Sequence, residues 1–149
     1  MKSIFLAAAA CLFLAGPASA MTDAECATLW HQANAKGGTQ LTGPESARYI
    51  AMLRIASKPL DADGTINQTI FNENCKADVF KIAAIDPGAP LTGANSFTEA
   101  QAEDRVVAAG MSLPSTMTKD ANGIWRGVTI QNGKSRNVAV DYKGNVVAQ

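Results

Sequence analysis

The chain has 149 residues, with 13 basic and 13 acidic side chains and one histidine. This length fits one ordinary domain, or two very small ones that share a core. The balanced charge gives no reason to expect binding to nucleic acid or to an anionic membrane. The sequence lacks the G-x-S-x-G, P-loop and G-x-G-x-x-G motifs of common enzyme classes, so we expect no catalytic activity.

Residues 1–20 have the pattern of a secretory signal peptide. Lys2 provides a short basic start, the apolar run Ile4–Ala15 follows, and an A-x-A cleavage site closes the segment. The run is too short to act as a membrane-spanning stop-transfer helix. A lipoprotein acylated at Cys11 is the alternative, although this cysteine lies too early in the chain and Ala8 stands where a large aliphatic residue is usual. We therefore expect a periplasmic or secreted protein that starts at Met21 and is not inserted in a membrane.

The mature chain would keep two cysteines, Cys26 and Cys75. Because an exported chain meets an oxidising compartment, we expect a disulfide bond between them. The bond would close a loop of about 50 residues, for which chain entropy gives about 4 kcal/mol of stabilisation. Two separate buried thiols are the alternative. Neither cysteine belongs to a C-x-x-C motif, so the sequence does not indicate a redox catalyst.

Capping signals and apolar periodicity predict four helices. Capping boxes begin the first helix (T-D-A-E) and the second (T-G-P-E), Asn67 caps the third, and Thr98 with Gln101 begins the fourth. Cys26 and Cys75 fall on the core-facing stripes of the first and third helices, which supports the disulfide. The expected helices span residues 22–35, 42–57, 67–84 and 98–110.

An antiparallel meander is expected over Asp120–Gln149, because three turn signals separate β-forming runs. Alternation places Ile124, Val128 and Ile130 on one face of its longest strand and Trp125 on the other. The fourth helix is the expected cover of the apolar face. The predicted fold class is α+β, with a helical N-terminal part packed beside or linked to an αβββ unit. The turn signals are Asn122-Gly123, Asn132-Gly133 and Lys143-Gly144.

The segment 59–70 (P-L-D-A-D-G-T-I-N-Q-T-I) resembles an EF-hand loop between two helices. Gly64 stands where the family needs a sharp turn, and Ile66 stands at the apolar eighth position. Pro59 and Ile70 replace the family's first Asp and last, bidentate Glu. With so few carboxylates, calcium would bind no tighter than about millimolar; the alternative is that these residues only shape a turn. The resemblance implies calcium ligands from Asp61, Asp63, Thr65 and Asn67.

The segment 34–45 resembles a second, more eroded copy of this loop. Lys36 occupies one of its ligand positions. The EF-hand-like resemblance covers about residues 22–82, within a helical region expected at 21–85, and segment 86–95 follows as a Pro- and Gly-containing linker. Positions one, eight, nine and twelve of the family are matched by Asn34, Leu41, Thr42 and Glu45.

The C-terminal residues, about 97–149, resemble PepSY-type domains, which are small extracytoplasmic αβββ modules. The family's T-x-x-x-A helix start, D-x-x-G-x-W/Y hairpin and D-x-x-G-x-V ending match Thr98–Ala102, Asp120–Trp125 and Asp141–Val146. No catalytic signature accompanies these positions. The resemblance implies a binding or inhibitory domain, with boundaries expected at 96–149.

These patterns predict an exported, non-enzymatic protein-interaction or regulatory module with an unknown extracytoplasmic protein as partner. A weak calcium-binding, EF-hand-like protein is the alternative. Trp125 and Arg126 are the expected partner contacts, since an exposed aromatic residue beside arginine is typical of interface anchors. Alternatively, Trp125 packs against linker residues such as Leu91. His31 falls on the polar side of the first helix, where we expect no catalytic role.

Overall fold

A computed structural model describes residues 20–81 and 88–148 of the chain. Helices precede strands, and the fold class is α+β, as predicted. None of the helices in these residues is long and apolar enough to cross a membrane. The elements in chain order are α1 (Asp23–Ala33), α2 (Pro44–Ile55), α3 (Gln68–Lys76), α4 (Glu99–Ala108), β1 (Thr118–Lys119), β2 (Trp125–Gln131), β3 (Lys134–Val140) and β4 (Val146–Ala148).

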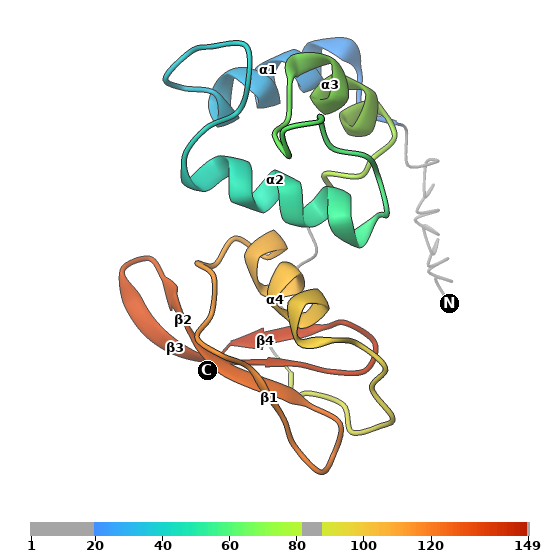
Figure 1. The fold of residues 1–149 in the computed structure, drawn as a ribbon, viewed down its shortest axis with the longest axis vertical. Helices are drawn as coiled ribbons and strands as arrows, with labels where there is room; N and C mark the ends of the chain where they lie inside the picture. The colour runs from blue at the N-terminus through green and yellow to red at the C-terminus, as the bar shows by residue number, and fades with distance from the viewer. Residues whose placement is uncertain (1–19, 82–87, 149) are drawn as a thin grey trace, which may run out of the picture.

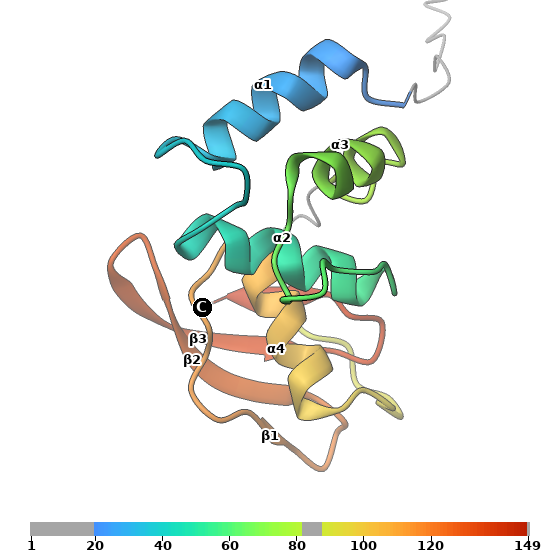
Figure 2. The same cartoon turned by 45° about the horizontal axis from the view of Figure 1, so that its top comes forward.

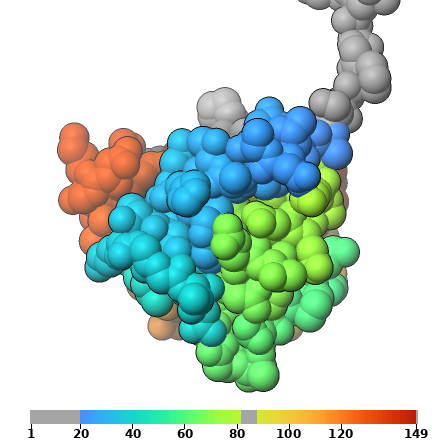
Figure 3. All heavy atoms as spheres, turned by 90° about the horizontal axis from the view of Figure 1, so that it is seen from above, coloured from blue at the N-terminus to red at the C-terminus, as the bar shows by residue number. Residues whose placement is uncertain are grey.

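The elements are stacked in layers (Figure 1). α1 and α3 form the outermost layer, α2 lies beneath them, and α4 lies between α2 and the sheet. A view turned by 45° shows the same order (Figure 2). Seen from above, the helical half covers most of this side, and the tip of the β2–β3 hairpin projects past it (Figure 3). The two halves of the chain therefore meet through α2 and α4, which contact each other extensively.

Local capping explains where three of the helices begin. The hydroxyl of Thr22 accepts the N–H of Glu25, and the Glu25 carboxylate accepts the N–H of Thr22, which closes the predicted capping box of α1. Thr98 and Gln101 form the same pair of bonds at α4, and Asn67 caps α3. These starts depend only on residues close in sequence, which is why the sequence predicted them.

The start of α2 differs from the prediction. Gly43, with a φ of 81°, is the N-cap residue, and no side chain caps the helix. Pro44 takes the first helical position, where its missing N–H costs nothing. Because the helix begins one residue later than a Thr42 cap requires, Glu45 is not at the third position and the predicted capping box does not form.

α3 is shorter than predicted. It ends at Lys76, and Asp78 has a left-handed φ of 59°, so the helix cannot continue toward residue 84. The carboxylate of Asp78 pairs with the ammonium of Lys81 at 2.9 Å, which holds the turn that follows. The expected helical residues 82–84, and the first two residues of the expected linker, lie outside the described part of the chain.

Aromatic rings form the centre of the helical half. Phe71 of α3 lies at the middle of the group, with its ring centroid between 4.8 and 5.2 Å from each of three neighbours. Such separations are favourable for aromatic pairs. The neighbours come from α1, α2 and the segment after α3, so one cluster holds all of these elements together. They are Trp30, Tyr49 and Phe80.

The predicted disulfide joins Cys26 of α1 to Cys75 of α3, with their Cα atoms 5.8 Å apart. Both residues are buried beside the aromatic rings. The bond spans a sequence separation of 49 residues that includes all of α2. It therefore restricts the unfolded chain and ties the two outermost helices to each other.

α4 is buried on two sides. Ala102 and Val106 face the sheet, where they pack in one cluster with Val138 and Val140 of β3 and Val146 of β4. Val107 and Ala108 belong instead to the core of the helical half. At the edge of this contact, Arg54 of α2 lies 3.4 Å from the carboxylate of Asp104. The helix that was predicted to cover the sheet therefore also packs against α2 on its other side.

The sheet is an antiparallel meander in the order β1-β2-β3-β4, as the turn signals predicted. Val138 and Val140 of β3 face α4 as expected. The predicted facing of β2 is wrong. Trp125 lies opposite Val140, and directly opposite residues of antiparallel strands share a face, so Trp125 faces α4 as well. Val128 and Ile130 consequently lie on the other face, 42% and 50% exposed.

The described part of the predicted linker 86–95 is packed on the turns of the sheet. The N–H of Leu91 donates to the Asp141 carboxylate at 3.2 Å. The N–H of Gly93 donates to the carbonyl of Asn122 at 3.0 Å. This segment is therefore part of the C-terminal half of the structure and does not span a gap as a free linker.

Two glycines at equivalent turn positions test this packing. Gly123 and Gly133 both have positive φ, of 76° and 73°. A Cβ atom at Gly123 would overlap the carbonyl oxygen of Gly93, whereas one at Gly133 would meet nothing within 4 Å. We expect Gly133→Ala to lower the free energy of unfolding by about 1 kcal/mol, the strain of a left-handed backbone. Gly123→Ala should lower it by clearly more, and urea unfolding measures both. Equal losses would contradict the packing of Gly93 on this turn.

Candidate functional site

The predicted calcium ligands lie together in the loop between α2 and α3. The N–H of Gly64 donates to the carbonyl of Asp61 at 2.9 Å, and the N–H of Asp61 donates to the carbonyl of Thr65 at 3.0 Å. Gly64 has a φ of 78°, as expected for a sharp turn at this position. The loop therefore folds back tightly on itself.

The side chains of this loop bond to one another. Nδ2 of Asn67 donates to Oδ2 of Asp61 at 2.7 Å, and Oγ1 of Thr65 donates to Oδ1 of Asp63 at 2.6 Å. The bonds from Thr65 hold the pKa of Asp63 below its usual value. Oδ1 of Asn67 accepts the N–H of Ile70 as the cap of α3. A calcium ion would have to compete with these bonds for the same oxygens.

The two EF-hand-like segments lie side by side. The N–H of Leu41 donates to the carbonyl of Ile66 at 2.9 Å, and Gln40 forms an isolated antiparallel bridge with Asn67. Nε2 of Gln40 also donates to Oδ2 of Asp63 at 3.1 Å. Leu41 and Ile66 are both buried, so the pairing of the loops closes one end of the helical core. Among the residues that the structure describes, no group of three or more His, Cys, Asp or Glu is placed to hold a metal ion.

The carboxylate of Asp120 is bound within its own turn. Its Oδ1 accepts the N–H groups of Asn122 and Ile124, at 2.9 and 3.0 Å. Nε of Arg126 donates to Oδ2 at 2.8 Å. The N–H of Ile124 and the guanidinium of Arg126 keep the pKa of Asp120 below its usual value, so this acid is a turn residue that remains ionised.

Asp141 has the same role in a buried position. Its side chain is 1% exposed. Burial raises the pKa of this carboxyl, but hydrogen bonds from Asn145, Leu91 and Lys143 outweigh burial and hold the pKa below its usual value. Asn145 contributes both its N–H and its side-chain amide, at 3.0 and 2.9 Å. Asp141 therefore joins the β3–β4 turn to the segment before α4.

Trp125 is half-buried against the cluster between α4 and the sheet. Its Nε1 donates to the carbonyl of Phe97 at 3.1 Å, and the ammonium of Lys119 lies 4.9 Å from the ring centroid. The ring thus packs toward the residue that precedes α4, on the face of the sheet opposite to the one predicted. Trp125 and Arg126, which were expected to act together, point to different faces.

Arg126 lies on the outer face, by which we mean the face of the sheet turned away from α4. Val128 and Ile130 follow it on the same face of β2 and are exposed. Arg126 also lines a hollow of about 220 Å³ beside Asn137 of β3. The outer face therefore combines two exposed apolar side chains with an arginine that is paired with Asp120.

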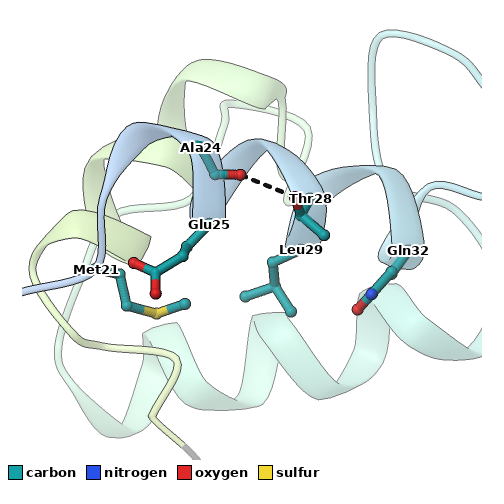
Figure 4. A pocket seen from close by; sticks show the side chains of 6 residues that line it. All are labelled: Met21, Ala24, Glu25, Thr28, Leu29 and Gln32. Atoms are coloured by element: carbon teal, nitrogen blue, oxygen red, sulfur yellow. Dashed lines mark hydrogen bonds between the residues drawn. The ribbon is translucent and has the colours of Figure 1, made fainter.

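The exposed side of α1 carries the histidine and a shallow hollow. His31 lies in the last turn of the helix and is exposed. Two of the polar side chains of the hollow are already engaged, because Thr28 donates to the carbonyl of Ala24 at 2.9 Å and Glu25 closes the capping box. We therefore assign no site there. The hollow is about 300 Å³ in volume and is lined by Met21, Ala24, Glu25, Thr28, Leu29 and Gln32 (Figure 4).

A larger groove, of about 550 Å³, lies between α2 and α4. Nε of Arg48 is buried there, and no hydrogen-bond partner for it is found among the described residues. The sequence did not predict this groove, because its walls come from residues far apart in the chain. The walls include the charged residues Glu45, Arg48, Arg54 and Asp104 and the apolar residues Ile50, Val107, Met111 and Leu113.

Comparison with known proteins gives no match to a family model, a curated protein or a solved structure. The EF-hand-like and PepSY-like resemblances therefore stay predictions from the sequence motifs.

The buried carboxylate of Asp141 generates a prediction of pH dependence. Because its pKa is lower in the folded chain than the usual value of about 3.9, its stabilisation is complete above that pH and is lost as the pH falls through the folded pKa. Asp141→Asn replaces one accepting carboxylate oxygen with a donating amide group, and it should lower the free energy of unfolding by about 1.5–3 kcal/mol at pH 7. In urea unfolding, this deficit should shrink below about pH 4. Asp120→Asn is the matched control at a more exposed turn, and it should lower the free energy of unfolding by less. A loss of stability in Asp141→Asn that does not change with pH would contradict the lowered pKa of Asp141.

Proposed function

We propose that this chain is an exported, non-enzymatic module that binds another extracytoplasmic protein through the outer face of its sheet. The observation that carries the proposal is the exposure of Val128 and Ile130 beside Arg126. The face toward α4 is filled by the protein's own core, whereas these apolar side chains on β2 have solvent before them. A partner that fits this surface presents an apolar patch to Val128 and Ile130, because the charge of Arg126 is already paired with Asp120.

Two further observations support this role. The disulfide between Cys26 and Cys75 supports export, because such bonds persist in oxidising compartments. The order of one capped helix and an antiparallel meander, with Asp120 and Asp141 bound in their turns, supports similarity to PepSY-type modules. The acidic side chains of those turns are engaged in structure, which favours binding over catalysis as the role of this half.

The experiment is partner capture with the purified mature chain from periplasm or culture medium, quantified by mass spectrometry. Val128→Asp/Ile130→Asp places two charges on the outer face and should reduce the captured partner about tenfold or more, as expected for interface anchors. Ile55→Asp is the matched control, because Ile55 is 40% exposed at the end of α2, away from the sheet. It should leave capture unchanged. Equal capture by both folded variants would contradict the proposal.

Weak calcium binding is the second candidate, and the pairing of the two EF-hand-like segments at Leu41 and Ile66 favours it. With two carboxylates, Asp61 and Asp63, the expected dissociation constant is about millimolar or weaker. In a calcium titration followed by NMR, the amide signals of Gly64 and Ile66 should shift and saturate.

A matched pair of variants makes this titration specific. Asp61→Asn/Asp63→Asn should abolish the shifts, whereas Glu73→Gln, which removes an exposed acid of α3 outside the loop, should not. Amide signals that stay in place up to several millimolar calcium would exclude this candidate.

A further inference from the structure

We propose that the groove between α2 and α4 is a binding site for an amphipathic carboxylate, a molecule with an apolar chain and one terminal carboxylate group. This site is separate from the outer face of the sheet and does not depend on the function proposed above. Its volume of about 550 Å³ lies in the range of small-molecule sites, roughly 300–1,000 Å³. It also lies where two parts of the chain meet, which is a common position for such sites.

The unpartnered guanidinium of Arg48 indicates the charge of the ligand. Nε of Arg48 is buried without a hydrogen-bond partner. A Cβ atom on Gly110 would lie 3.9 Å from Cζ of Arg48, so the guanidinium lies against the turn that ends α4. Burying a charged donor without an acceptor is costly. Nε itself has almost no accessible surface, so a carboxylate in the groove would bind the terminal amino groups of the guanidinium, for which no hydrogen bond or ion pair with the described residues is found. Guanidinium and carboxylate groups match in shape as well as in charge.

Among the charged residues that line the groove, Arg48 is the one available to bind an anion. Arg54 is already paired with Asp104, whose carboxylate lies 3.4 Å away. Glu45 also lines the groove, but it is exposed in the first turn of α2, where water and salt screen its charge. The guanidinium of Arg48 is therefore the cation without a counter-charge among the charged side chains that line the groove.

The remaining walls indicate an apolar chain. Ile50, Val107 and Met111 line the groove, and Leu113 at its edge is 69% exposed. A ligand chain lying on Leu113 would remove apolar surface from water. The flexible side chain of Met111 can adjust to chains of different shape. The groove thus offers a cation for a carboxylate and apolar side chains for hydrocarbon.

Such a ligand would contact both halves of the chain at once. α2 contributes Ile50 and Arg48, whereas α4 and the segment after it contribute Val107, Met111 and Leu113. A ligand that binds only when these walls are together stabilises the folded chain by mass action. Binding should therefore raise the midpoint of thermal unfolding as well as shift NMR signals of the groove.

The experiment compares three probes on the mature chain by NMR titration: octanoate, octan-1-ol and acetate. Octanoate should produce saturable amide shifts at Arg48, Val107 and Leu113. Octan-1-ol lacks the charge, and acetate lacks the chain. The affinity for each should therefore be lower than that for octanoate by about tenfold or more, as expected for the loss of a charged hydrogen bond or of the buried chain. The proposal would be overturned if octanoate caused no shifts up to about 10 mM, or if the shifts lay mainly outside the groove. Equal affinity for octan-1-ol would overturn it as well.

Arg48→Met tests the role of the guanidinium, since it keeps an unbranched apolar side chain but removes the charge. Its affinity for octanoate should fall about tenfold. Lys143→Met is the control, because Lys143 is an exposed cation of the β3–β4 turn that does not line the groove, and this variant should bind octanoate as the unchanged protein does. Equal binding by both variants would overturn the proposal. If Arg48→Met does not fold, the comparison of octanoate with octanol on the unchanged chain still decides the question.

Discussion

The burial of α4 on two sides is the constraint on which the rest of the structure depends. Ala102 and Val106 of this helix pack on the sheet, and Val107 and Ala108, one or two positions further along, pack into the helical half. Small side chains on both sides allow the layers to approach closely. Because one helix serves two cores, each half supports the other, and the groove at Arg48 exists only while they are together.

The polar residues that attract attention in the sequence are mostly engaged within the fold. Asp141 and Asp120 hold turns, and Asn67 caps a helix while it bonds to the loop carboxylate of Asp61. The side chains that remain open to a partner are of another kind. They are apolar residues on the outer face of β2, and an arginine in the groove whose Nε is buried without a partner.

Sequence reasoning succeeded where the deciding contacts are local, and it failed at the facing of β2. That strand has apolar residues on both of its faces, so alternation alone does not say whether Trp125 or Val128 points inward. The tight turn at Asn132-Gly133 sets the register that places Trp125 opposite Val140. With Val140 on the face of β3 that packs on α4, this register turns Trp125 toward α4 as well. No comparable signal in the sequence points to the groove.

The sequence by itself determined the capped helix starts at Thr22 and Thr98, the three turns of the meander, the α+β class and the cysteine pair. Each depends on residues within a few positions of one another, or, for the cysteines, on the expected oxidising compartment and the helical spacing of both residues. Only the tertiary structure decided which face of β2 is exposed, and that α2 rests on α4. The same is true of Arg48, which is left without an acceptor beside Gly110. These features arise between residues tens of positions apart, where packing against distant elements outweighs local preference.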